Sequence, residues 1–272
     1  MNKEKRVKLI SYTPEPEKIC EAAARLSQIN KSGLEIYNTD FEKKILGNVI
    51  KLGHRSVLEH AYFNFIFEDV SVFVEHFLIE FRLGSYTVKS RRYVDFRNSG
   101  YIIPEYLRNT QFLKIRAKFQ EYIDFLLKTY SKLVDMNIPV EDSRFILPYC
   151  FKSSFFLSMN ARELLHVLYS MIYGRGKSYP EIKSLGEEML IILKEVSPIL
   201  FDGLLLLEGT EDRWTKVYSL IKDLPQNNNF ENNDKDKVEE IFFPNNGEKI
   251  ICSSFYQCFN KKYSDLDDDK IK

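Results

Sequence analysis

The sequence has few of the residues that would build a metal site or a disulfide framework. It contains four cysteines and four histidines in 272 residues. The cysteines are scattered without a CxxC pair, so neither a zinc site nor a disulfide scaffold is predicted. His54, Glu59 and His60 would form only part of a metal site, because no matching ligands are evident elsewhere. We therefore expect no metal and a reduced, cytoplasmic setting.

An excess of charge of either sign is also absent. Lys and Arg number 39, Asp and Glu number 39, and the formal net charge is zero. This balance argues against binding to a nucleic-acid polymer, and any anion site must be local. No apolar run reaches the roughly 18 residues of a membrane helix. The apolar stretch at residues 7–11 is too short for a signal sequence, so we expect no membrane partner.

Common catalytic motifs are missing as well. The sequence contains no Walker loop, no GxGxxG after a strand and no HExxH. Hydrophobic residues make up 44% of the chain and aromatic residues 14%, which predicts a substantial core. The composition changes after about residue 224, where an asparagine-rich polar segment begins. We predict one domain over residues 1–224 and a polar, partly disordered extension over residues 225–272.

Hydrophobic periodicity predicts a mixture of strands and helices. We expect strands at residues 7–12, 61–68, 92–96 and 151–159, and a turn or short helix at 56–60. Helices are expected at residues 16–29, 41–52, 71–83, 107–136, 139–148, from 161, at 179–196 and at 199–207. Asp40 and Asn160 are predicted helix caps, and Gly84 is expected to end the helix that begins at Ser71.

A basic loop is the most informative local feature. Arg82, Lys89, Arg91 and Arg92 lie within eleven residues, interleaved with glycine and serine. Guanidinium groups and hydroxyls around a glycine turn suit a phosphate. The competing interpretation is an exposed basic loop without a ligand. His166 likewise has two interpretations, a ligand-binding side chain or a satisfied histidine in the core.

Several motifs in order resemble the flavin-dependent thymidylate synthase family. The resemblance covers about residues 7–205. Its landmarks are Gly53-His54-Arg55-Ser56-Val57-Leu58-Glu59-His60, Ser85-Tyr86-x-x-x-Ser90-x-Arg92-Tyr93, Glu141-x-x-Arg144-x-x-Leu147-Pro148, Asn160-Ala161-Arg162-x-Leu164, Glu181-Ile182 and Ala23-Ala24-Arg25-Leu26-Ser27.

The resemblance implies an α+β fold, an antiparallel sheet with a bundle of long helices, in a homotetramer with shared active sites. It implies bound FAD, NADPH as the reductant, and transfer of one carbon from methylenetetrahydrofolate to dUMP. The implied flavin-side residues are Ser27, His54, Ser56, Glu59, Arg82, Asn160, Arg162 and His166. The implied nucleotide-side residues are Ser90, Arg91, Arg92 and Arg144. Of these, Ser90 and Arg82 are the implied catalytic residues.

The sequence departs from the family pattern at the join between the two ligand sites, where the replaced residues are Phe77, Glu80, Phe81 and Val88. It departs again at Met171, where the resemblance implies an arginine that would face the pyrimidine. Arg175 would replace the arginine expected at Met171 only if its helix shifted by a turn. Three interpretations stay open: a thymidylate synthase, a flavoenzyme of the same fold with another nucleotide or carbon donor, and a non-catalytic subunit that pairs with an intact paralogue.

Overall fold

The computed structural model describes residues 6–202, which all belong to one unit of the chain, Met1–Glu208. Four strands form a sheet: β1 (Val7–Tyr12), β2 (Tyr62–Ser71), β3 (Ser85–Val88) and β4 (Lys152–Asn160). The α-helices are α1 (Pro16–Leu26), α2 (Gly33–Tyr37), α3 (Lys43–Lys51), α4 (Val72–Ile79), α5 (Leu113–Asp135), α6 (Val140–Ser143), α7 (Ala161–Ile172), α8 (Pro180–Val196) and α9 (Pro198–Asp202). The 3-10 helices are η1 (Arg55–His60), η2 (Glu105–Arg108), η3 (Thr110–Phe112) and η4 (Arg144–Ile146).

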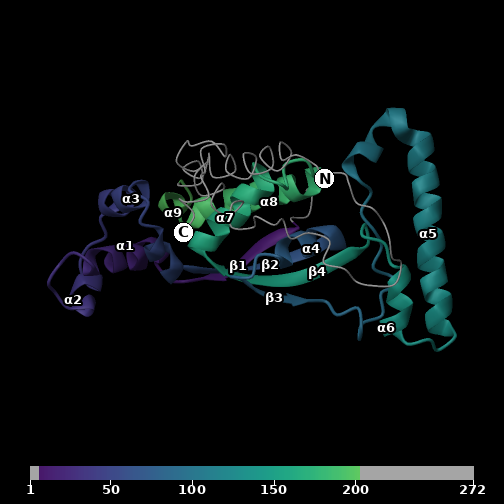
Figure 1. Cartoon of the computed structure of the whole chain (residues 1–272), viewed down its shortest axis with the longest axis horizontal. Helices are drawn as coiled ribbons and strands as arrows, with labels where there is room; N and C mark the ends of the chain where they lie inside the picture. The colour runs from purple at the N-terminus through teal and green to yellow at the C-terminus, as the bar shows by residue number, and fades with distance from the viewer. Residues whose placement is uncertain (1–5, 203–272) are drawn as a thin grey trace, which may run out of the picture. The chain divides into compact units, whose positions relative to one another are not determined.

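The sheet is antiparallel throughout, with strand order β1-β2-β4-β3 (Figure 1). Alternation along β2 sends Phe63, Phe65 and Phe67 into the core, where all three are fully buried. These rings meet buried side chains of α7 and α8, and Phe63 packs edge-on against Phe201 of α9 at 5.5 Å between ring centroids. One face of the sheet is therefore the core face, which confirms the predicted α+β class.

A smaller buried cluster joins α5 to the segment that follows the basic loop. It consists of Val72, Phe96, Tyr130 and Phe151. The Tyr130 hydroxyl accepts a hydrogen bond from the Phe96 backbone N–H at 3.3 Å. The Phe96 and Phe151 rings also meet edge to face at 4.9 Å. This cluster holds the far end of the basic loop in place.

Most predicted elements are confirmed, including β1, β4, α8 and the short helix at residues 55–60. The Asn160 cap is confirmed because its side-chain oxygen accepts from the Glu163 N–H at 2.9 Å. The predicted strand at 92–96 is wrong. The Val94 N–H donates to the Ser90 carbonyl at 3.0 Å, so the chain turns there, and the paired strand is β3.

Several predicted boundaries are also wrong. α3 begins at Lys43 after Glu42, so Asp40 is not its cap. α4 ends at Ile79, five residues before Gly84. The long helix α5 begins later than predicted, because residues 105–112 form two 3-10 turns. The helix α2 was not predicted, although Ser32 and Glu35 form a capping box that the sequence already displays.

Gly84 has a packing role in the turn from α4 to β3. A Cβ at this position would lie 2.5 Å from Met159 Cε and 3.1 Å from the Tyr86 hydroxyl. Such contacts are too close for any larger residue without movement of its neighbours. The missing side chain therefore leaves room at this turn for the ends of the Met159 and Tyr86 side chains. The predicted extension at 225–272 and the end of the helix predicted at 199–207 lie outside the described residues.

Candidate functional site

The amino-terminal end of α7 gathers several of the predicted flavin-side residues. Asn160 caps the helix, and Arg162 forms an ion pair with Glu59 of η1 through Nη1 and Oε1. Both of these side chains are about half exposed. His166 lies one turn after Arg162 on the same side of the helix, 3.5 Å from a Glu163 oxygen. The helix therefore presents a cation and an imidazole side by side at the surface.

An aromatic contact extends this row toward α4. The rings of His166 and Phe81 meet edge to face, 5.3 Å apart. Phe81 is buried, and its carbonyl accepts a hydrogen bond from the Tyr86 hydroxyl at 3.0 Å. Burial raises the pKa of Tyr86, and the neighbouring Glu163 raises it further. Tyr86 is therefore a neutral donor that fixes the backbone beside Phe81.

Of the other predicted flavin-side residues, two lie at η1 beside Glu59 and two lie on other elements. His54 precedes η1, and Ser56 lies within it with an exposed side chain. Arg82 is exposed in the turn between α4 and β3. Ser27 follows α1 and donates its hydroxyl proton to the Ala24 carbonyl at 2.8 Å. The structure thus brings Glu59, Arg162 and His166 into one row, whereas Ser27 is engaged in a local helix-end contact.

Adjacent arginines of the basic loop pair with different carboxylates. Arg91 makes two hydrogen bonds to the carboxylate of Glu75, at 3.0 and 2.7 Å. Arg92 instead pairs with Glu141 at 2.7 Å, and both of these side chains are about half exposed. Arg91 is thus committed to the protein interior, and Arg92 remains at the surface where a ligand could reach it.

A second predicted nucleotide-side residue joins Arg92 at Glu141. The Nε of Arg144 donates to the Glu141 carbonyl at 2.9 Å, while the Glu141 carboxylate pairs with Arg92. The Ser90 hydroxyl oxygen accepts from the Arg92 N–H at 3.2 Å. Arg92 thus contacts the Glu141 carboxylate, Arg144 contacts the Glu141 backbone, and Ser90 contacts the Arg92 backbone. That arrangement of guanidinium groups and a hydroxyl suits a phosphate.

Glu75 is the important residue that the sequence interpretation missed. Its carboxylate is 1% exposed and also accepts a hydrogen bond from the Ser153 hydroxyl. The sequence carried a signal, because Glu75 stands in a helix whose other residues, apart from His76, are apolar. A charge in such a helix indicates a buried ionic partner, since unpaired buried charges are strongly unfavourable.

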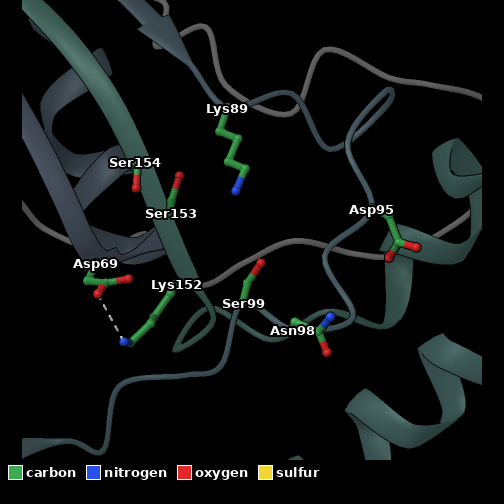
Figure 2. Close-up of a pocket in the computed structure, with 8 residues that line it drawn as sticks. All are labelled: Asp69, Lys89, Asp95, Asn98, Ser99, Lys152, Ser153 and Ser154. Atoms are coloured by element: carbon green, nitrogen blue, oxygen red, sulfur yellow. Dashed lines mark ion pairs between the residues drawn. The ribbon is translucent and has the colours of Figure 1, made fainter.

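Lys89 points into a polar pocket of about 290 Å³ (Figure 2). The pocket is lined by Asp69, Lys89, Asp95, Asn98, Ser99, Lys152, Ser153 and Ser154. Lys152 and Asp69 form an ion pair at one edge of the pocket, at 3.3 Å, and Asp95 pairs with Arg97. The hydrogen bond between Arg97 and Asp95 lowers the pKa of that carboxyl. Lys89 therefore has surroundings separate from those of Arg92.

Metal ligands, thiols and membrane-spanning helices can each be assessed in the part of the chain that the structure describes. Between residues 6 and 202, no group of three or more metal-binding side chains is found. Burial raises the pKa of Cys20 to about 12 and that of Cys150 to about 11, so both thiols are protonated at neutral pH. No helix within this part of the chain is long and apolar enough to cross a membrane.

Comparison with known proteins identifies the class. Residues 8–199 match the family model described as thymidylate synthase complementing protein. The chain is 35% identical over 201 residues to a flavin-dependent thymidylate synthase of Geobacter sulfurreducens, covering 72% of this chain and 85% of that relative. A Saccharolobus solfataricus protein of the same name is 31% identical, with 72% and 75% covered. The chain belongs to the flavin-dependent thymidylate synthase family.

A solved structure supports the fold independently. The structure described as the UMP/dUMP methylase PolB of Streptomyces cacaoi, bound with 5-Br dUMP, superposes with a TM-score of 0.60 at 20% identity. The match covers 72% of this chain and 93% of that chain. At this identity the likeness establishes the shared architecture and no more. The functional assignments of individual residues stay predictions.

Proposed function

We propose that the protein is an FAD-dependent thymidylate synthase that converts dUMP to dTMP. In this proposal methylenetetrahydrofolate is the one-carbon donor and NADPH is the reductant. The observation that carries it is the surface row of Glu59, Arg162 and His166, three of the predicted flavin-side residues. Relatives at 31–35% identity that are named as flavin-dependent thymidylate synthases support the same activity.

The chemistry of the row fits FAD. Arg162 and His166 present hydrogen-bond donors suited to a pyrophosphate, and Glu59 holds the Arg162 guanidinium in place. Asn160 fixes the end of the helix that carries both donors. His54 and Ser56 on neighbouring η1 would complete the contacts. When bound, reduced flavin supplies the reducing equivalents for the methylation.

The cluster of Ser90, Arg92 and Arg144 supports a nucleotide phosphate site. A phosphate there would compete with the Glu141 carboxylate for the Arg92 guanidinium. The Ser90 hydroxyl accepts a hydrogen bond from the Arg92 backbone N–H. Among the described residues, no imidazole or carboxylate base is hydrogen-bonded to it. A Ser90 without such a base would orient the nucleotide more readily than attack it. We assign Arg82, an exposed side chain in the turn between α4 and β3, to the same reaction.

A homotetramer in the cytoplasm is the setting we propose. The face of the sheet opposite the core exposes Tyr62 and Phe156 by about half of each side chain. Exposed aromatic side chains on a sheet face favour contact with another surface. Active sites shared between subunits would then bring the flavin row of one chain toward the nucleotide cluster of another.

A second candidate function is a flavoenzyme of the same fold with another nucleotide or carbon donor. Met171, where the family pattern has an arginine, is fully buried, so its side chain faces the core and not a ligand. Glu80, Phe81 and Val88 are further replacements. A non-catalytic subunit that pairs with an intact paralogue is the corresponding interpretation without activity.

The deciding experiment supplies purified protein with FAD, dUMP, methylenetetrahydrofolate and NADPH. Formation of dTMP together with NADPH oxidation is the expected result. NADPH oxidation without dTMP would favour the second candidate. A protein that neither co-purifies with FAD nor binds added FAD would refute every flavin-based proposal.

A further inference from the structure

One arginine contacts three of the residues at which the sequence departs from its family. The Arg175 guanidinium carbon lies 4.6 Å from the centre of the Phe77 ring and 5.4 Å from that of Phe81. Its Nη1 forms an ion pair with Glu80, and Nη2 donates to the Phe77 carbonyl at 3.5 Å. The replacements at Phe77, Glu80 and Phe81 therefore form one cluster around Arg175.

The turn after α7 places Arg175 in this cluster without any shift of the helix. The Gly174 N–H donates to the Tyr169 carbonyl at 2.9 Å, and the Gly176 N–H donates to the Ser170 carbonyl at 2.8 Å. A Cβ at Gly176 would lie 2.8 Å from the Met171 backbone. The chain thus folds back tightly at the helix end, and Arg175 reaches α4 from there.

The electrostatics of this cluster point toward a ligand more than toward stability. The side chains of Glu80 and Arg175 are 57% and 53% exposed. An ion pair this exposed contributes little to folding. Without Arg175, however, the Glu80 carboxylate would lose this counter-charge and would repel an anionic ligand. Of the five N–H donors of a guanidinium, only two have partners among the described residues, so three can face a ligand.

Phe81 connects Arg175 to the flavin row. Its ring contacts both the Arg175 guanidinium and the His166 ring. Arg162 and His166 present their polar groups from the next element. The buried Phe81 ring therefore links the exposed Arg162 and His166 to Arg175.

We propose that Arg175 is a ligand-binding, specificity-determining residue of this protein. It neutralises Glu80 and donates hydrogen bonds to oxygens of an anionic, phosphate-bearing heterocyclic nucleotide. This inference rests on the proposed function, and the ligand is either the flavin dinucleotide or the nucleotide substrate. Both share the required chemistry, and separate titrations distinguish them.

The test compares Arg175→Ala, Arg175→Lys, Glu80→Gln and the Arg175→Ala/Glu80→Gln double variant with the wild type. FAD affinity is measured by flavin fluorescence and dUMP affinity by calorimetry. Arg175→Ala should lower the affinity for one of these ligands about 10- to 100-fold, which is the effect of losing one hydrogen bond from a charged group. Arg175→Lys should recover part of the affinity, because it keeps the charge and loses the planar fork.

The double variant separates neutralisation from direct contact. It should bind the affected ligand more tightly than Arg175→Ala alone, because Glu80 no longer repels the ligand. A double variant as weak as Arg175→Ala would overturn the neutralising role. Arg108→Ala is the matched control, since Arg108 forms a similarly exposed pair with Glu105 on η2.

The outcomes also separate this inference from the proposed function. If the wild type binds neither FAD nor dUMP, the proposed function fails and this inference falls with it. If the wild type binds either ligand and both affinities of Arg175→Ala and Arg175→Lys stay within about twofold, only the role of Arg175 is overturned. Melting temperatures equal to that of Arg108→Ala establish that any loss of affinity is local.

Discussion

Substitution of Arg91 by alanine is expected to destabilise the protein by about 3–5 kcal/mol. The substitution removes two hydrogen bonds and the counter-charge from Glu75, whose side chain is 1% exposed. Ser153 would be the only remaining partner among the described residues. The magnitude comes from the cost of leaving an uncompensated charge in the interior, which exceeds the net contribution of the intact pair.

The neighbouring Arg92 provides the control. Arg92 and Glu141, which form an ion pair, are each about half exposed. Arg92→Ala should therefore lower the free energy of unfolding by only about 0–1 kcal/mol. Urea unfolding followed by circular dichroism measures both free energies of unfolding. For a chain of this size, 3–5 kcal/mol corresponds to a fall in melting temperature of roughly 10 °C.

A double variant tests the cause. Glu75→Leu with Arg91→Met removes both charges and keeps apolar volume, so it should recover most of the stability lost in Arg91→Ala. Equal stabilities of Arg91→Ala and Arg92→Ala would refute the argument. Loss of dUMP affinity in Arg91→Ala at unchanged stability would return Arg91 to the nucleotide site.

Three further predictions follow from the same geometry. Arg92→Ala should weaken dUMP binding about 10- to 100-fold by calorimetry, and unchanged affinity would remove Arg92 from the phosphate site. Burial raises the pKa of Cys20 to about 12 from an ordinary value near 9. The stability that the neutral, buried Cys20 thiol contributes is therefore complete below pH 9. It is lost as the pH rises toward 12, by about 1.4 kcal/mol per pH unit. Urea titrations should show a shallower alkaline slope in Cys20→Ala. Gly176→Ala should lower the free energy of unfolding by about 1–3 kcal/mol, because its Cβ would lie 2.7 Å from Ile182 and 2.8 Å from the Met171 backbone. An unchanged melting temperature would show that this turn is loosely packed.

Local patterns predicted the core elements well because their cause is local. Alternation of Phe63, Phe65 and Phe67 corresponds to a strand with one buried face, and the structure has that strand. Asn160 directly before an apolar helix predicted a cap, and its side chain accepts the expected N–H. These features depend on neighbours within a few residues, so a sequence displays them directly.

The failure at residues 92–96 has a different cause. The predicted strand at 92–96 was wrong because side chains near it are drawn to distant partners, Arg91 to Glu75 and Arg92 to Glu141. Arg175 was expected to replace the arginine missing at Met171 only if its helix shifted by a turn; the turn at Gly174 instead returns Arg175 toward Phe77. Such pairings depend on segments that lie far apart in the sequence.

The sequence alone determined the α+β class, most of the elements and the family to which the chain belongs. Only the tertiary structure decided which of its cations face the surface. Arg91 and Arg92 are adjacent and chemically identical, yet one is paired with a buried carboxylate and the other with an exposed one. The reason is physical: a guanidinium has the same chemistry everywhere, and its role depends on the burial and the charge of the group that the fold places beside it.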